Sequence, residues 1–324
     1  MDFEQIKNLA QKVKNNVSQV IVGKDEVIEQ LLIALIASGN VLLEDVPGMG
    51  KTMLAKSLAL SLDCSFKRIQ FTPDLLPSDL TGINYYNQKS GEFEFRPGPI
   101  FTNILLADEI NRATPRTQSS LLECMEERQV TVDGDTRKLN SPFMVIATQN
   151  PVETQGTFPL PEAQLDRFLL KVKMGYPTTA EGIEILKRFK EANPLVDIQP
   201  VVDREDIIAA QESYSKVYVS DDMLEYIVKI VERTRQHNDV ILGVSPRGSQ
   251  ALLKTAQVHA ILQGRDFATP DDVKAMAKPV LAHRIVMKNV MGVRGNRAED
   301  IIDQILKDVE VPAEESLIKE KEKQ

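Results

Sequence analysis

Five short apolar segments recur along the first half of the chain, and each has the length of a β-strand. They are residues 41–43, 66–71, 103–107, 143–147 and 168–172. Stretches with helical spacing separate most of these segments: residues 53–62, 117–127 and 161–165. Because strands that alternate with helices pair in parallel and are covered on both faces, the pattern predicts an α/β fold around a five-stranded parallel sheet.

Two features depart from this simple alternation. Residues 3–19 carry apolar side chains at three- and four-residue spacing, and residues 25–37 are strongly apolar, so we expect two helices before the first strand, the second of them buried. Residues 82–99 alternate around Asn-Gln-Lys-Ser-Gly, which predicts a β-hairpin inserted into the α/β order, with Phe93 and Phe95 on one face.

The strand pattern stops after residue 177, and the rest of the chain has helical spacing. We expect helices at residues 182–192, 204–214, 221–236, 247–262 and 271–284. The chain should therefore divide into an α/β core at residues 1–177, an all-helical domain at residues 178–311 and a charged tail at residues 312–324, whose alternating charges leave little to bury.

The composition is that of a globular chain, with 42% hydrophobic and 27% charged residues among 324. An excess of 47 acidic over 39 basic side chains gives a formal net charge of -8, so we expect no nucleic acid partner. Cys64 and Cys124 are the only cysteines and form no C-x-x-C pair, which disfavours a disulfide framework or a zinc site and indicates a reducing compartment.

Membrane and metal patterns are equally sparse. The longest apolar run, residues 31–37, is too short to cross a bilayer, and the first residues do not have the pattern of a signal peptide. We therefore expect a cytoplasmic protein without a membrane span. His237, His259 and His283 lie far apart in the sequence, so we do not expect them to bind a metal.

Residues 41–52 have the order of a strand, a phosphate-binding loop and a helix. The residues that would surround the phosphates are Pro47, Gly48, Met49, Gly50, Lys51 and Thr52. The glycines let backbone N–H groups close around phosphate oxygens, and the start of the following helix adds a positive dipole end. The lysine would reach the β- and γ-phosphates, and the threonine hydroxyl would bind Mg²⁺.

This loop departs from the strict phosphate-loop pattern at one position. Asp45 stands where that pattern has glycine, although aspartate also adopts turn conformations. Taken alone, residues 50–52 would also fit a glycine turn before an ordinary helix. Ile21 and Val22, with Gly23 beside them, are candidates for lining a pocket for the nucleotide base, and packing in the core is the alternative for them.

Two carboxylates follow the apolar segment 103–107. Asp108, at the end of this strand, would hold Mg²⁺ through its water shell, and Glu109 would polarise the water that attacks the γ-phosphate. An acidic pair can also begin a helix as a cap. The functional interpretation therefore depends on the phosphate loop that precedes the pair in the sequence.

Three further side chains are candidates for contact with the phosphates. Asn150 follows the segment 143–147, at the carboxyl end where parallel sheets bind ligands, and a turn asparagine is the alternative. Arg167 and Arg247 could stabilise transition-state charge, or they could form surface ion pairs. Arg247 lies in the first turn of a helix, where a cation opposes the helix dipole.

These stretches resemble the MoxR family of AAA+ ATPases. The resemblance rests on residues 45–52, 106–113 and, above all, 147–168. It covers residues 20–175 strongly and extends more loosely into the helical part, through residues 245–248.

The resemblance implies a role for each candidate residue. It implies Walker A at residues 45–52, Walker B at Asp108 and Glu109, sensor 1 at Asn150, an arginine finger at Arg167 and sensor 2 at Arg247. It further implies that the hairpin at residues 82–99 is a helix-2 insert, and that the helical domain is a lid that closes on ATP through Arg247.

The resemblance also implies an assembly and partners. An arginine finger acts on the nucleotide of a neighbouring subunit, so the family resemblance implies a ring, usually a hexamer. MoxR-like proteins are chaperones that use ATP to mature or remodel partner complexes, often together with von Willebrand factor A domain proteins. This chain shows no such domain, so we expect that partner to be a separate protein.

Other functions stay open at this point. Related AAA+ cores serve metal chelatases and nucleic-acid motors, and a slow nucleotide-dependent switch would bind ATP with little hydrolysis. The guanine-binding motifs Asn-Lys-x-Asp and Thr-Lys-x-Asp do not occur in the chain, so we expect ATP and Mg²⁺ rather than GTP.

Overall fold

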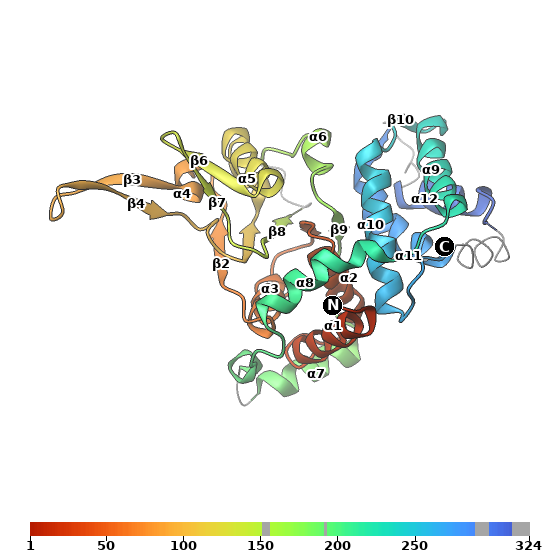
Figure 1. Ribbon diagram of the computed structural model, residues 1–324, viewed down its shortest axis with the longest axis horizontal. Helices are drawn as coiled ribbons and strands as arrows, with labels where there is room; N and C mark the ends of the chain where they lie inside the picture. The colour runs from red at the N-terminus through yellow and green to blue at the C-terminus, as the bar shows by residue number, and fades with distance from the viewer. Residues whose placement is uncertain (151–155, 191–192, 289–297, 313–324) are drawn as a thin grey trace.

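A five-stranded parallel sheet forms the centre of the first half of the molecule (Figure 1). The computed structural model describes residues 1–150, 156–190, 193–288 and 298–312. The strands are β1 Val41–Glu44, β2 Phe66–Gln70, β5 Ile104–Asp108, β8 Met144–Gln149 and β9 Leu170–Val172. They lie in the order β2-β5-β8-β1-β9 and pair in parallel, which confirms the predicted α/β fold. All five strands therefore end at the same edge of the sheet.

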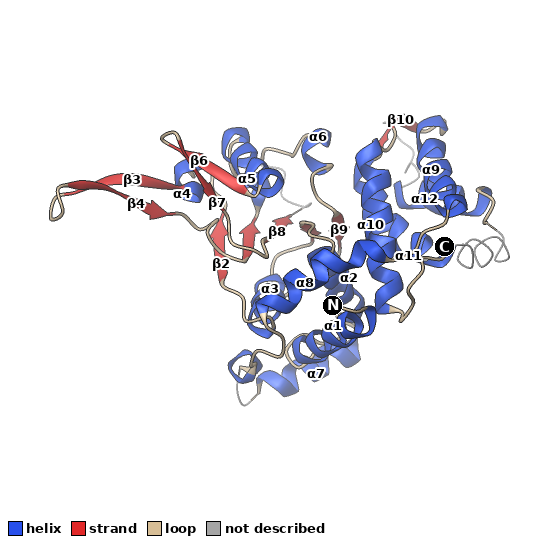
Figure 2. Cartoon of the chain, in the orientation of Figure 1, coloured by secondary structure: helices blue, strands red, loops and turns tan. Residues whose placement is uncertain are grey.

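Helices cover both faces of this sheet (Figure 2). They are α1 Phe3–Val17, α2 Asp25–Ile36, α3 Lys51–Ser61, α4 Pro77–Thr81, α5 Pro115–Glu127 and α6 Glu162–Leu165, with a 3₁₀ turn at Ile110–Arg112. Alternate residues of each strand face opposite cores. Ile104 and Leu106 belong to the core shared with α1, α2 and α3, whereas Leu105 and Ala107 belong to the core shared with α5.

The predicted hairpin is confirmed. β3 Gly82–Asn87 pairs antiparallel with β4 Glu92–Pro97, and the two strands project from the body of the molecule (Figure 1). Gly82 at its base has φ +92°, and a Cβ there would lie 2.3 Å from the carbonyl oxygen of Arg96, so this position requires glycine.

A second hairpin was not predicted from the sequence. β6 Gln129–Val132 and β7 Asp135–Lys138 pair antiparallel around a two-residue turn. Asp133 and Gly134 form this turn, both with positive φ, as the tight hairpin turns require. This hairpin lies between α5 and β8 in the sequence.

The rest of the chain is mainly helical, and its helices lie in two places (Figure 1). α7 Thr179–Phe189 lies near the end of α1 and α8 Arg204–Ser213 packs against α2, whereas α9 Asp221–Gln236, α10 Pro246–Leu262, α11 Pro270–Leu281 and α12 Ala298–Asp308 gather beyond β9. Short 3₁₀ helices occur at Pro194–Asp197, Tyr214–Lys216 and Ala282–Arg284. Arg188 of α7 donates to the carbonyl oxygens of Ser18 and Gln19 at 2.6 and 2.7 Å.

The prediction of an all-helical second part was wrong in one respect. β10 Val240–Leu242 pairs antiparallel with β11 Val286–Met287. Strands of three and two residues are too short to show a period-two pattern. The helix α12 was not predicted from the sequence either. Apart from residue 312, the expected charged tail lies outside the described residues.

Within the described ranges, none of the helices has both the length and the apolar character that crossing a bilayer requires.

Candidate active site

The phosphate loop connects β1 to α3. Gly48 and Gly50 both have φ +84°, a left-handed conformation that glycine adopts at little cost. A Cβ built on either glycine would meet nothing within 4 Å, so open space lies beside the loop. Gly50 is the N-cap of α3, whose first residues are Lys51 and Thr52. An open loop of left-handed glycines at a helix N-terminus fits a phosphate group, and Pro47 and Met49 complete it.

The lysine of this loop is held by a hydrogen bond to the backbone of the same loop. Lys51 is buried, and its Nζ donates to the carbonyl oxygen of Asp45 at 3.0 Å. The Asp45 carboxylate accepts hydrogen bonds from the backbone N–H groups of Met174 and Gly175, which follow β9. The residue that departs from the strict pattern therefore connects the start of the loop to the chain after the sheet's edge strand.

An apolar cavity of about 230 Å³ adjoins the phosphate loop. It is lined by Val20, Ile21, Val22, Lys24, Gly48, Met49, Gly50, Met53, Met174, Pro177, Ile185 and Phe189. The structure thus brings Ile21 and Val22 next to the loop glycines, as a pocket for a planar base would need. Gly23 lies between two lining residues, and a Cβ there would collide with Glu181 at 1.9 Å.

The two acids lie at the end of β5 and are held by neighbouring strands. Asp108 Oδ1 accepts from Thr148 Oγ1 at 2.6 Å, and its Oδ2 accepts from Arg68 Nη2 at 2.6 Å. The Thr148 hydroxyl also accepts from the backbone N–H of Glu109 at 2.8 Å. A threonine hydroxyl at Thr52 and a carboxylate at Asp108 are oxygen donors of the kind that Mg²⁺ prefers.

Glu109 is fixed more tightly than the sequence indicates. Its φ and ψ are 56° and 51°, a left-handed conformation that is costly for a glutamate and typical of functional positions. Its Oε2 accepts from Gln70 Nε2 at 2.7 Å and pairs with Arg112 Nε at 3.0 Å. Gln70 reaches it because Gln70 and Asp108 are partners in the register of β2 and β5.

Asn150 completes this edge of the sheet. It directly follows β8, which lies between β5 and β1, and it is buried. Asp108 is the last residue of β5, Asn150 follows β8 and Lys51 comes after β1, so the three lie at the carboxyl ends of three adjacent strands. In parallel sheets this edge is where ligands bind.

The two candidate arginines lie elsewhere. Arg167 precedes β9, so it lies at the edge where the strands begin, opposite the phosphate loop. Its Nη1 lies 3.4 Å from Glu126 Oε2, and Arg247 Nη2 pairs with Glu126 Oε1. Both arginines line a cavity of about 250 Å³ together with residues 37–40, which precede β1. The structure brings Arg167 and Arg247 together, but not to the phosphate loop of their own chain.

Sequence reasoning did not identify several of these contacts. The residues missed are Arg68, Gln70, Arg112, Glu126 and Thr148. Within the described residues, no group of three or more His, Cys, Asp or Glu side chains could hold a metal ion by itself.

Comparisons with known proteins agree with this geometry. Residues 40–170 match the model of the ATPase family associated with various cellular activities (AAA), and residues 232–305 match an AAA lid domain. The uncharacterized protein YeaC of Bacillus subtilis is 52% identical over 98% of this chain and 99% of its own length. The chaperone MoxR1 of Mycobacterium tuberculosis is 40% identical over 91% of this chain and 80% of its own length.

A solved structure shares the whole arrangement. A candidate ATPase from Cytophaga hutchinsonii superimposes with a TM-score of 0.89 at 39% identity. The match covers 95% of this chain and 96% of that one.

Proposed function

Because the chain belongs to the MoxR family of AAA+ ATPases, we propose that it binds ATP with Mg²⁺, hydrolyses it, and uses the cycle to remodel a partner protein. The observation that carries the proposal is the convergence of the phosphate loop, the acid pair and Asn150 at the ends of adjacent strands. In the described part of the chain, this is the edge of the sheet at which a phosphate-binding loop and carboxylates lie together.

In this proposal, each residue at this edge has a separate role in binding or hydrolysing ATP. The loop N–H groups and Lys51 bind the β- and γ-phosphates, while Thr52 and Asp108 are the residues that would hold Mg²⁺. When bound, Mg²⁺ offsets negative charge on the phosphate oxygens. Glu109 accepts the proton of the attacking water, and Asn150 donates a hydrogen bond that orients this water or the γ-phosphate.

The base occupies the apolar cavity beside the loop. Ile21 and Val22 pack against one side of it, and α7 supplies Ile185 and Phe189 to the same cavity. Because α7 belongs to the C-terminal part of the chain, a bound nucleotide contacts both parts of the molecule at once.

The arginines serve a second copy of the chain. Arg167 and Arg247 lie at the sheet edge opposite the phosphate loop, so each subunit can offer them to the nucleotide of its neighbour. Head-to-tail contacts of this kind generate a ring when the rotation closes. We propose such a ring, with six subunits as its expected size. The arginines then neutralise charge that develops on the transferred phosphoryl group.

The projecting hairpin is the proposed contact with the client. Tyr86 and Phe93 stack edge-to-face and are 54% and 75% exposed, although large aromatic side chains are usually buried. The chaperone named among the relatives supports a protein client in general. A von Willebrand factor A domain protein, which the family resemblance implies, is the partner class that we propose to test first.

The function is tested by Glu109→Gln. We expect this variant to bind ATP as the wild type does, because the loop is unchanged, and to lose about 100-fold or more in kcat, because the amide cannot accept a proton. Calorimetry measures the binding and phosphate release measures the turnover. Glu212→Gln, on the exposed surface of α8, is the matched control and should retain wild-type turnover.

Two outcomes would contradict the proposal. Near-normal hydrolysis by Glu109→Gln would remove Glu109 from the proton-accepting role. A wild-type protein that does not bind ATP in calorimetry would overturn the proposed function as a whole.

A further inference from the structure

One carboxylate contacts both candidate arginines. Glu126, near the end of α5, has one oxygen 3.4 Å from Arg167 Nη1 and the other paired with Arg247 Nη2. The two arginines come from different parts of the chain: one precedes β9 and the other begins α10. Each guanidinium has five N–H donors, so each keeps donors for another ligand after its contact with Glu126.

The segments next to these arginines are joined by side-chain contacts that do not involve Glu126. Asp166 accepts from Ser245 Oγ at 2.8 Å and from Arg284 Nε at 2.7 Å. Arg284 is buried in the 3₁₀ helix Ala282–Arg284 that follows α11, and it also donates to the carbonyl oxygen of Phe168 at 2.6 Å. The residues that flank Arg167 and Arg247 are thus held together, and only the two long side chains remain to be oriented.

The cavity around the two arginines carries mostly positive charge, so a carboxylate is needed to keep the two guanidinium groups side by side. The charged residues that line the shared cavity are Arg128, Arg167, Arg247, Lys254 and Arg284 against Glu126 and Asp166. Asp166 is already engaged by Arg284 and Ser245. Without Glu126, the guanidinium groups of Arg167 and Arg247 would repel each other and adopt other rotamers.

We propose that Glu126 is a positioning residue that holds Arg167 and Arg247 as one pair, directed at the triphosphate of a neighbouring copy of the chain. The proposal rests on the proposed function, because it needs a nucleotide that the pair can reach. The cavity's excess of cations suits a polyanion such as a triphosphate. Glu126 itself does not touch the reacting atoms.

The test compares Glu126→Gln with Glu127→Gln, a substitution of the adjacent exposed carboxylate on the same helix. Because exposed ion pairs add little to stability, Glu126→Gln should keep the melting temperature and assembly of the wild type. We expect kcat to fall about tenfold with KM for ATP unchanged, because the phosphate loop and base cavity are intact. Glu127→Gln should have wild-type kcat.

A second comparison separates positioning from a purely structural role. In an Arg247→Ala background the pair no longer exists, so Glu126→Gln should lower the remaining kcat by less than about threefold. A structural role would lower kcat by the same factor in both backgrounds. Equal factors would therefore overturn the proposal.

The outcomes also distinguish this inference from the proposed function. If Arg167→Ala abolishes hydrolysis while Glu126→Gln retains full kcat, the positioning role is wrong and the proposed function stands. If the wild-type protein does not hydrolyse ATP, the proposed function fails, and the positioning role fails with it.

Discussion

Asp45 shows how a departure from a motif can have a structural reason. The strict phosphate-loop pattern has glycine at this position, but here the carboxylate accepts backbone N–H groups of Met174 and Gly175. Its own carbonyl oxygen accepts from Lys51. The residue therefore holds the loop lysine with its main chain and the segment after β9 with its side chain.

Restoring the usual glycine should weaken the protein. Asp45→Gly removes the acceptor of two N–H groups, so we expect the free energy of unfolding to fall by about 1–3 kcal/mol. Urea unfolding without nucleotide measures this change. Asp45→Asn keeps one acceptor oxygen, so its free energy of unfolding should fall by less than that of Asp45→Gly. An Asp45→Gly variant as stable as the wild type would show that the contact contributes nothing.

The site residues that could be predicted are those that share a stretch of sequence. Lys51 and Thr52 follow their glycines directly, and Glu109 follows Asp108, so a motif reveals them together. Gln70 could not be found in this way. It contacts Glu109 because of the register of two strands, and a single sequence does not specify which residues of different strands are partners.

Among the elements, the ones with strong periodicity were predicted and the short polar ones were not. The first hairpin alternates aromatic and polar residues, and this pattern predicted both of its strands. The second hairpin contains β7 Asp135–Lys138, whose side chains are all polar, so only the Asp133-Gly134 turn indicated it. Val130 of this hairpin is buried in the core shared with α5, and Val132 packs against that core.

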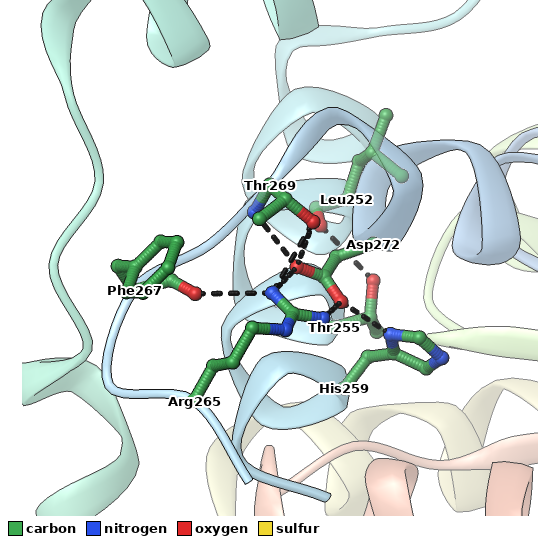
Figure 3. Close-up of polar contacts among 7 residues, drawn as sticks. All are labelled: Leu252, Thr255, His259, Arg265, Phe267, Thr269 and Asp272. Carbon is green, nitrogen blue, oxygen red and sulfur yellow. Dashed lines mark hydrogen bonds and ion pairs between the residues drawn. The ribbon is translucent and has the colours of Figure 1, made fainter. Parts of the chain in front are cut away.

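A buried carboxylate joins α10 to α11 (Figure 3). Asp272 is fully buried and accepts from Arg265 at 2.6 Å, from His259 at 2.6 Å and from the backbone N–H of Thr269 at 2.7 Å. Burial by itself would raise the pKa of Asp272, but the hydrogen bonds, above all from Arg265, outweigh it and lower the pKa to about 2.

This network predicts a pH-dependent loss of stability. Asp272→Asn should lower the free energy of unfolding by about 2–4 kcal/mol at pH 7, because the charged partner of Arg265 is lost. Since the folded pKa is depressed, the contribution is fully present above the unfolded carboxyl pKa of about 4 and is lost as pH falls toward 2. Urea unfolding between pH 7 and pH 3 measures the difference.

The matched control is the adjacent carboxylate. Asp271 has a side chain that is 90% exposed, so Asp271→Asn should leave stability within about 0.5 kcal/mol. At pH 3 the difference in free energy of unfolding between the wild type and Asp272→Asn should be about half its value at pH 7. If this difference does not change with pH, the ionised Asp272 carboxylate does not stabilise the fold as we predict.

At the scale of the whole molecule, the proposed function assigns complementary halves of one reaction to the two edges of the sheet. The phosphate loop, Asp108, Glu109 and Asn150 lie at the carboxyl ends of strands, whereas Arg167 and Arg247 lie where strands begin. A sequence predicts the members of both halves, but it cannot specify that Arg247 shares a carboxylate with Arg167, because that contact joins α5 to α10.

The separation of these edges makes the central claim testable by mixing variants. Lys51→Ala lacks a working phosphate loop but keeps its arginines, and Arg167→Ala keeps its phosphate loop but lacks one arginine. Each variant alone should have little ATPase activity. In a mixed ring, the arginine of a Lys51→Ala subunit can complete the site of an Arg167→Ala neighbour.

The most direct measurement is therefore the ATPase rate of an equimolar mixture of Arg167→Ala and Lys51→Ala subunits, assembled together and compared with each variant alone. We predict that the mixture hydrolyses ATP clearly faster than the mean of the two separate samples. A mixture no faster than that mean, from subunits shown to co-assemble, would contradict the claim that a neighbouring chain completes the site.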